Sequence, residues 1–117
     1  MAPKALTKAD RITAGERIYN QVCFACHQAT GLGIPNAFPP LAQSDFLLAD
    51  PRDAAAGIIF GRQGEIVVNG KTYNGVMPAL GMSDEEIASV ITYVLNAWGN
   101  DGGELTPDDV KEVRASR

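Results

Sequence analysis

The segment Cys23-Phe24-Ala25-Cys26-His27 decides how this chain of 117 residues is interpreted. Two thiols stand one helical turn apart, and the only histidine of the chain follows the second thiol directly. A disulfide across a single helical turn is strained and uncommon. A structural zinc site needs four ligands, and the chain offers only two cysteines and one histidine. A thioredoxin-like redox pair needs a surrounding βαβ unit, which the sequence does not show. The sequence therefore gives little support to a disulfide, a zinc site or a thioredoxin-like redox pair.

The pattern C-x-x-C-H is instead typical of covalent haem attachment. Thiols one turn apart can each add across one vinyl group on the same edge of a porphyrin. The next residue then lies beneath the ring with its imidazole directed at the iron. A proximal histidine is a common ligand of haem iron. We therefore predict one covalently bound haem c, attached through Cys23 and Cys26 and ligated by His27.

The sixth ligand of the iron cannot be a second histidine, because His27 is the only one, and the methionines Met1, Met77 and Met82 remain. Pro78 favours Met77, since a proline pushes the preceding residue toward an extended backbone and removes a competing amide donor. Met82 stands beside the start of the next helix, where packing against the core is the more natural role. We predict that His27 and Met77 ligate the iron. Met82 and an open iron position remain the alternatives.

The rest of the chain predicts an all-α fold, a small domain with a loop-rich crevice and a minor β-hairpin. Helical periodicity runs over residues 7–22 and 83–98, and Asp50-Pro51 opens a short helix. Asn69-Gly70 between β-forming residues signals the hairpin. Glycines and prolines make residues 29–43 an irregular loop. Because this middle part is poor in apolar residues, we expect the haem to complete the core and the apo-chain to fold poorly.

The helix starts and the domain limits follow from capping signals and from glycine-rich stretches. Two candidates cap the first helix, either Thr7 or the capping box of Thr13 and Glu16. Ser83 and Glu86 form a clear capping box for the second long helix, which Gly99 is expected to stop. We expect three segments: 1–6 as a disordered N-terminus, 7–99 as the haem-binding domain, and 100–117 as a C-terminal linker with a short helix.

Composition excludes several classes of function. The chain has 14 acidic against 10 basic residues and no basic stripe, so we expect no nucleic-acid partner. No stretch approaches the roughly 18 apolar residues of a membrane span. No apolar run follows the first residues, as it would in a signal peptide. We therefore expect a mature form or an excised domain without a membrane span.

These motifs together resemble those of class I c-type cytochromes, over about residues 8–99. The resemblance rests on a helix that ends in the attachment segment, on Phe38-Pro39-Pro40-Leu41, on Val76-Met77-Pro78, and on the capped terminal helix. It implies an electron carrier, not an enzyme, in which the Pro39 carbonyl accepts a hydrogen bond from the proximal histidine. Pro40 is the less favoured choice, and two prolines that merely stiffen the loop are a further alternative. It also implies that the first and last helices cross, and the residues that would fill the crossing are Gly15, Tyr19, Tyr93 and Trp98.

A narrower likeness concerns residues 69–78, 96–100 and the Thr-Pro-Asp-Asp-Val tail. They are similar to the haem domains fused to copper nitrite reductases, which implies periplasmic electron transfer to a type 1 copper in denitrification. Cytochrome subunits of quinoprotein or molybdenum dehydrogenases look alike here too, and a haem enzyme or gas sensor with an open iron is a weaker alternative. We expect an apolar contact rim of Gly31, Gly33, Ile34, Pro35 and residues 76–80.

Overall fold

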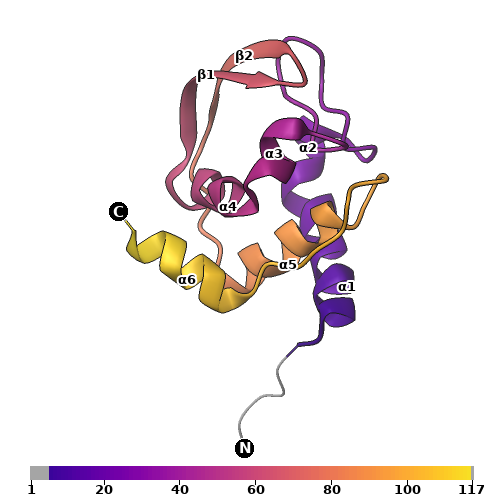
Figure 1. Cartoon of the computed structure of the whole chain (residues 1–117), viewed down its shortest axis with the longest axis vertical. Helices are drawn as coiled ribbons and strands as arrows, with labels where there is room; N and C mark the ends of the chain where they lie inside the picture. Colours follow the sequence, from indigo (N-terminus) through magenta and orange to yellow (C-terminus); the bar gives the residue numbers. More distant parts are fainter. Residues whose placement is uncertain (1–5, 117) are drawn as a thin grey trace, which may run out of the picture.

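Two crossed helices form the centre of the fold in this computed structural model, which describes residues 6–116. The elements follow the order α1 (Lys8–Ile18), a π-helical turn η1 (Tyr19–Cys23), α2 (Phe24–His27), α3 (Asp45–Ala49), α4 (Pro51–Phe60), β1 (Arg62–Val68), β2 (Lys71–Met77), α5 (Asp84–Leu95) and α6 (Pro107–Ala115). Figure 1 shows α1 crossing α5, with α6 beginning beside the start of α5 and extending away from α1. The hairpin and the loop after α2 lie at the end of the molecule opposite the start of α1. The chain therefore has the predicted helical fold with one small antiparallel sheet.

The first helix begins at Lys8 because Thr7 caps it. The Thr7 hydroxyl accepts a hydrogen bond from the Asp10 amide at 3.1 Å, and the Asp10 carboxylate accepts one from the Thr7 amide at 3.0 Å. The alternative start at Thr13 is wrong, since Thr13 lies inside the helix and donates its hydroxyl to the Ala9 carbonyl. An aspartate three residues after the cap performs the reciprocal role that Glu or Gln usually fills.

The crossing of α1 and α5 depends on a glycine. A Cβ placed on Gly15 would lie 2.0 Å from the Ser89 carbonyl oxygen, so only a residue without a side chain allows the two backbones to approach this closely. Beside this contact, the rings of Tyr19, Tyr93 and Trp98 pack edge to face or tilted, with centroids 5.1–5.7 Å apart. Such pairs stabilise by about 0.5–1.5 kcal/mol beyond the area they bury. All four residues occupy the crossing that the family resemblance implies.

The second long helix ends earlier than predicted. It begins as expected, with the capping box of Ser83 and Glu86, but ends at Leu95. Periodicity carried the prediction to Trp98, because that residue continues the apolar stripe. Trp98 instead has a positive φ of 52°, and Gly99 follows with 79°. This left-handed turn directs the Trp98 ring back toward Tyr19.

The hairpin pairs β1 with β2 in antiparallel register from Arg62 opposite Met77 to Val68 opposite Lys71. Asn69 and Gly70 form the turn with φ values of 52° and 80°, as the Asn-Gly signal predicts. The turn is attached to α3 by a reciprocal pair of hydrogen bonds, in which the Asn69 and Asp45 side chains each accept from the other residue's amide. The hairpin is thereby held over the loop-rich half of the molecule.

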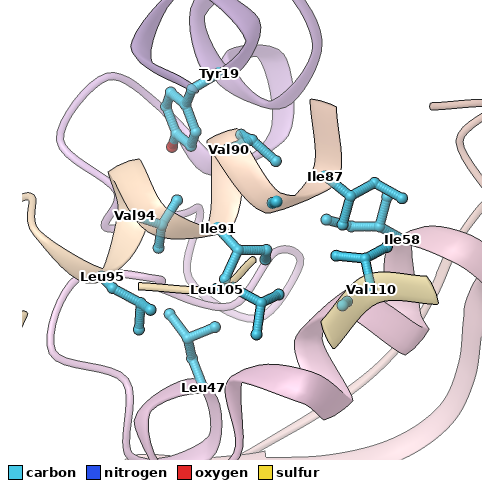
Figure 2. Packing of buried hydrophobic residues seen from close by; sticks show 12 residues of the cluster. Tyr19, Leu47, Ile58, Ile87, Val90, Ile91, Val94, Leu95, Leu105 and Val110 are labelled. Atoms are coloured by element: carbon cyan, nitrogen blue, oxygen red, sulfur yellow. The ribbon is translucent and has the colours of Figure 1, made fainter. Parts of the chain in front are cut away.

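The C-terminal segment packs against the domain from which the sequence analysis separated it. Leu105 and Val110 are almost completely buried, and Val113 is nearly so. Figure 2 shows Leu105 and Val110 directed into the same cluster as residues of α5 and α4. Burial of such a side chain stabilises a fold by about 1.5–3 kcal/mol. Residues 100–116 thus contribute buried side chains to the core, while the N-terminal segment 1–6 falls, apart from Leu6, outside the described residues.

Across residues 6–116, none of the helices combines the length and the apolar character that crossing a membrane would require.

Candidate haem site

The attachment segment lies where α1 passes through a π-helical turn into α2. Such turns widen the helix by one residue and occur often at functional sites. Cys23 ends the turn, Cys26 lies in α2, and both are half-buried free thiols. Burial raises the pKa of the Cys23 thiol to about 11, and nearby Cys26 adds to the shift. A neutral thiol is unlike the low-pKa thiolate of a disulfide oxidoreductase. Within the part of the chain that the structure describes, no three His, Cys, Asp or Glu side chains gather to hold a metal ion.

His27 is the last residue of α2 and is held in one orientation by Pro39. Its Nδ1 lies 2.9 Å from the Pro39 carbonyl oxygen. A carbonyl oxygen only accepts hydrogen bonds, so Nδ1 carries the proton and donates it. The other ring nitrogen, Nε2, then has a free lone pair, as a metal ligand requires. Burial lowers the pKa of His27, which favours this neutral, ligating form.

The loop that supplies Pro39 is fixed by the aromatic residues of the helix crossing. The Trp98 Nε1 donates to the Ala29 carbonyl at 2.9 Å, and the Tyr19 hydroxyl donates to the Gln28 carbonyl. Gly31 approaches the indole so closely that a Cβ would lie 2.5 Å from the ring. The crossing therefore not only packs the core but also positions the segment that orients His27.

Asn100 secures the far end of the same loop, a role that the sequence analysis missed. Its side-chain amide donates to the Leu41 carbonyl at 3.1 Å and to the Val94 carbonyl at 2.7 Å. Its side-chain oxygen accepts from the Gln43 amide. One side chain thus joins the loop after Pro39 to the end of α5. An asparagine in a glycine-rich stretch usually signals only a turn, so no local pattern points to this role.

Met77 and Met82 lie at the two ends of one loop, and both are half-buried against the core cluster. Met77 is the last residue of β2 and pairs with Arg62. Behind it lies Gly61 with φ of 78°, where a Cβ would meet the Met77 carbonyl oxygen at 3.0 Å. The backbone of Met82 is engaged differently: its amide donates to the Leu80 carbonyl at 2.8 Å. Met77 therefore lies at the paired end of a strand, whereas Met82 directly precedes Ser83, the cap of α5.

A cavity of about 240 Å³ lies between the loop after α2 and the hairpin. Its lining is mostly apolar on the side of the loop and carries polar groups on the side of the hairpin. The lining residues are Leu32, Pro35, Pro40 and Ala42 from the loop, and Val68, Asn69, Lys71 and Tyr73 from the hairpin. Pro40 thus lines this cavity, while the neighbouring Pro39 contacts His27. Neither His27 nor Met77 lines this cavity, so it is separate from the side chains predicted to ligate the iron.

The donor set fits a covalent haem. Two unpaired thiols one turn apart, an imidazole with a free Nε2 and a half-buried thioether are the groups that haem c attachment and ligation use. The elements supply these groups from two places: the turn η1 and the helix α2 carry the two thiols and the imidazole, and the strand β2 ends with the thioether of Met77.

Comparisons with known proteins point to one family. The family profile described as cytochrome c matches residues 12–98. A cytochrome c-552 of Thermus thermophilus is 39% identical over 126 aligned residues, covering 97% of this chain and 80% of that protein. A second cytochrome c-552 of the same species is also 39% identical, covering 88% of this chain and 86% of that protein. The fructose dehydrogenase cytochrome subunit of Gluconobacter japonicus is 33% identical, and 90% of this chain matches 23% of that longer protein.

Proposed function

This chain belongs to the cytochrome c family, and on that premise we propose that Cys23 and Cys26 attach its haem while His27 and Met77 ligate the iron. Membership establishes an electron carrier with covalently bound haem c, and not an enzyme. When bound, the haem supplies an iron that cycles between the ferrous and ferric states. The roles assigned to individual residues rest on the geometry described above.

The contact between His27 and Pro39 carries the proposal. By accepting a hydrogen bond from the Nδ1–H group, the Pro39 carbonyl holds the ring in the tautomer that directs Nε2 away from the loop. A hydrogen bond of this kind raises the basicity of the ligating nitrogen and fixes the orientation of the ring. The aromatic contacts with Ala29 and Gln28 keep the loop in place beneath it. The proximal side of the site is therefore prearranged, which limits its reorganisation during electron transfer.

Met77 completes the site better than Met82 does. Pro78 follows Met77 and restrains its backbone, and Gly61 allows the strand end to lie close against the end of α4. An axial thioether raises the reduction potential of the haem, which suits a relay. The alternative of an open iron position predicts ready binding of carbon monoxide, which a ligated Met77 opposes.

The two segments that carry the proposed ligands contain no charged side chains, which suits brief contact with a redox partner. Residues 18–44 and 72–83 contain no Asp, Glu, Lys or Arg. Leu32 and Val76 are 62% and 71% exposed, and Ile34 is 38% exposed. The segments meet where a Cβ on Gly75 would lie 3.7 Å from the Ala37 carbonyl oxygen. We call these two segments the uncharged rim. It extends the apolar contact rim expected from the sequence.

For the partner, the relatives favour a dehydrogenase. Proteins named as cytochrome subunits of fructose, alcohol (quinone) and gluconate dehydrogenases match most of this chain. The likeness of residues 69–78 to haem domains of copper nitrite reductases supports a type 1 copper partner as the second candidate. Both would place the chain in the periplasm, where covalent haem attachment and such enzymes occur together.

The partner is tested by stopped-flow electron transfer. The oxidised chain is mixed with a reduced quinoprotein dehydrogenase, and the reduced chain separately with a copper nitrite reductase that lacks its own haem domain. We expect rapid reduction by the dehydrogenase. Reaction with the copper enzyme alone would reverse the assignment and restore a role in denitrification. Failure with both would remove both partners, while the electron-carrier role would stand on the family.

A further inference from the structure

Arg114, in the last turn of α6, lies against the loop that leads from Met77 into α5. Its Nε donates to the Asp84 carboxylate at 2.9 Å, and its Nη2 donates to the Met82 carbonyl at 3.1 Å. Asp84 is the first residue of α5. We call the loop from Met77 to Met82 the methionine loop. One guanidinium therefore binds both the end of this loop and the start of the helix that follows it.

Few hydrogen bonds hold the loop itself, although Leu80 also packs against the core cluster. Residues 78, 79 and 81 are exposed, and Pro78 has no amide proton to donate. The Leu80 amide donates to the Ile58 carbonyl at 2.9 Å, which attaches the middle of the loop to α4. The far end is attached to α6 by the Arg114 contact with Met82. Segments with so few attachments open more readily than the core does.

The helix that carries Arg114 is well anchored to the rest of the domain. Val110 and Val113 of α6 are buried in the core, and Arg52 of α4 forms ion pairs with Asp109 at 2.6 Å and Glu112 at 3.1 Å. The family profile matches only residues 12–98, so α6 lies outside the part of the chain that defines the family. The helix is thus a separate support that contacts α4, α5 and the methionine loop.

We propose that Arg114 is a positioning residue for the sixth iron ligand: by holding the Met82 end of the loop, it keeps Met77 on the iron. The proposal rests on Met77 as the ligand, as proposed above. An external ligand such as imidazole binds the ferric iron only after Met77 has left it. Its apparent affinity therefore scales with the fraction of molecules in which the loop is open. Losing the Arg114 contacts enlarges that fraction.

The test is an imidazole titration of the oxidised holoprotein, with the Met-to-iron absorption band in the far red recorded in parallel. Arg114→Gln is compared with Arg52→Gln, which also removes ion pairs of α6 but none to the loop. We expect Arg114→Gln to bind imidazole about fivefold more tightly, the size expected from losing one exposed charge-assisted contact. Arg52→Gln should stay within about twofold of the parent. Arg114→Lys, which keeps the charge but offers a single point donor, should lie between the two.

The outcomes separate the proposals. Equal tightening in both glutamine variants would make Arg114 an ordinary anchor of α6 and overturn the inference, as would an unchanged affinity in Arg114→Gln. A parent protein without the far-red band would show that Met77 is not the ligand, and both proposals would fail together. If Arg114→Gln folds poorly, Asp84→Asn replaces it, because the Asp84 carboxylate fixes the guanidinium in place and its loss weakens the Arg114 contact with Met82. Asp84→Asn should tighten imidazole binding in the same direction, and an unchanged affinity would overturn the inference.

Discussion

Replacing Gly15 with alanine tests the helix crossing on which the site depends. The change should favour α1 by itself, since alanine is about 0.8–1 kcal/mol better than glycine inside a helix. The crossing opposes it. The new Cβ would lie 2.0 Å from the Ser89 carbonyl oxygen and 2.7 Å from the Tyr93 Cβ, whereas ordinary contact begins at 3.4 Å. The nearest obstacle is backbone, so no side-chain rotation relieves the clash.

The two helices must therefore separate by an ångström or more at this point. A gap of about 0.5–1 Å already forfeits a quarter to a half of the dispersion energy of each contact. Overpacking of a core contact costs about 1–3 kcal/mol and sometimes more. Because the obstacle is backbone, we place the cost at the upper end of this range, about 3 kcal/mol; after the gain in helix propensity, Gly15→Ala should lower the free energy of unfolding by about 2 kcal/mol.

The assay is urea unfolding of the oxidised holoprotein followed by far-ultraviolet circular dichroism. Gly81→Ala is the matched control, because nothing lies within 4 Å of a Cβ at that position. The control should be neutral or slightly stabilising. If Gly15→Ala unfolds at the same urea concentration as the parent, the close crossing of α1 and α5 is refuted.

Three further predictions concern the cofactor, the rim and the helix caps. With both attachment cysteines replaced by alanine, the haem-free chain should lose most of its helical circular dichroism, and a native-like spectrum would show that the haem is not needed to complete the core. Raising the ionic strength about tenfold should change the rate of electron transfer to the partner less than about threefold, because an uncharged rim gives little steering; a steep fall would place charges in the contact. Hydrogen bonds from Ser83 lower the pKa of Glu86, and bonds from Thr106, the backbone one foremost, lower the pKa of Asp109. These two carboxylates stabilise the folded protein fully at pH values above their ordinary pKa values of 4.5 and 3.8. The stabilisation is lost as the pH falls through the lowered pKa values of the folded protein. Urea unfolding at neutral pH and at about pH 3.5 should therefore show a smaller acid loss for Glu86→Gln than for the parent, and equal losses would contradict the capping contribution.

Local signals in the sequence predicted the elements well, because they depend on neighbouring residues. Ser83 with Glu86 starts α5, Asp50 starts α4, and Asn69 with Gly70 turns the hairpin, each by a contact within three residues. The end of α5 was missed for the opposite reason. Trp98 continues the apolar stripe in sequence, yet its place is set by distant partners, the Ala29 carbonyl and the Tyr19 ring.

The same distinction applies to the site. The attachment segment is local, so its chemistry follows from spacing alone, whereas the choice between Pro39 and Pro40 needs the three-dimensional path of the loop. The structure brings the Pro39 carbonyl to His27 and turns Pro40 toward the cavity. Asn100 and Arg114 carry no local signal at all, because both act across long stretches of sequence. Residues after 99 have the sequence of a linker, because the helices that bury their apolar side chains, α4 and α5, are distant in sequence.

The absorption spectrum of the oxidised protein tests the central claim, a haem iron held between His27 and Met77, most directly. The parent protein should show the far-red band of Met-to-iron charge transfer, and the reduced form should bind carbon monoxide poorly. Met77→Ala should abolish the band and open the iron to carbon monoxide, while Met82→Ala should leave both properties unchanged. A band that survives in Met77→Ala, or that disappears in Met82→Ala, would contradict the assignment.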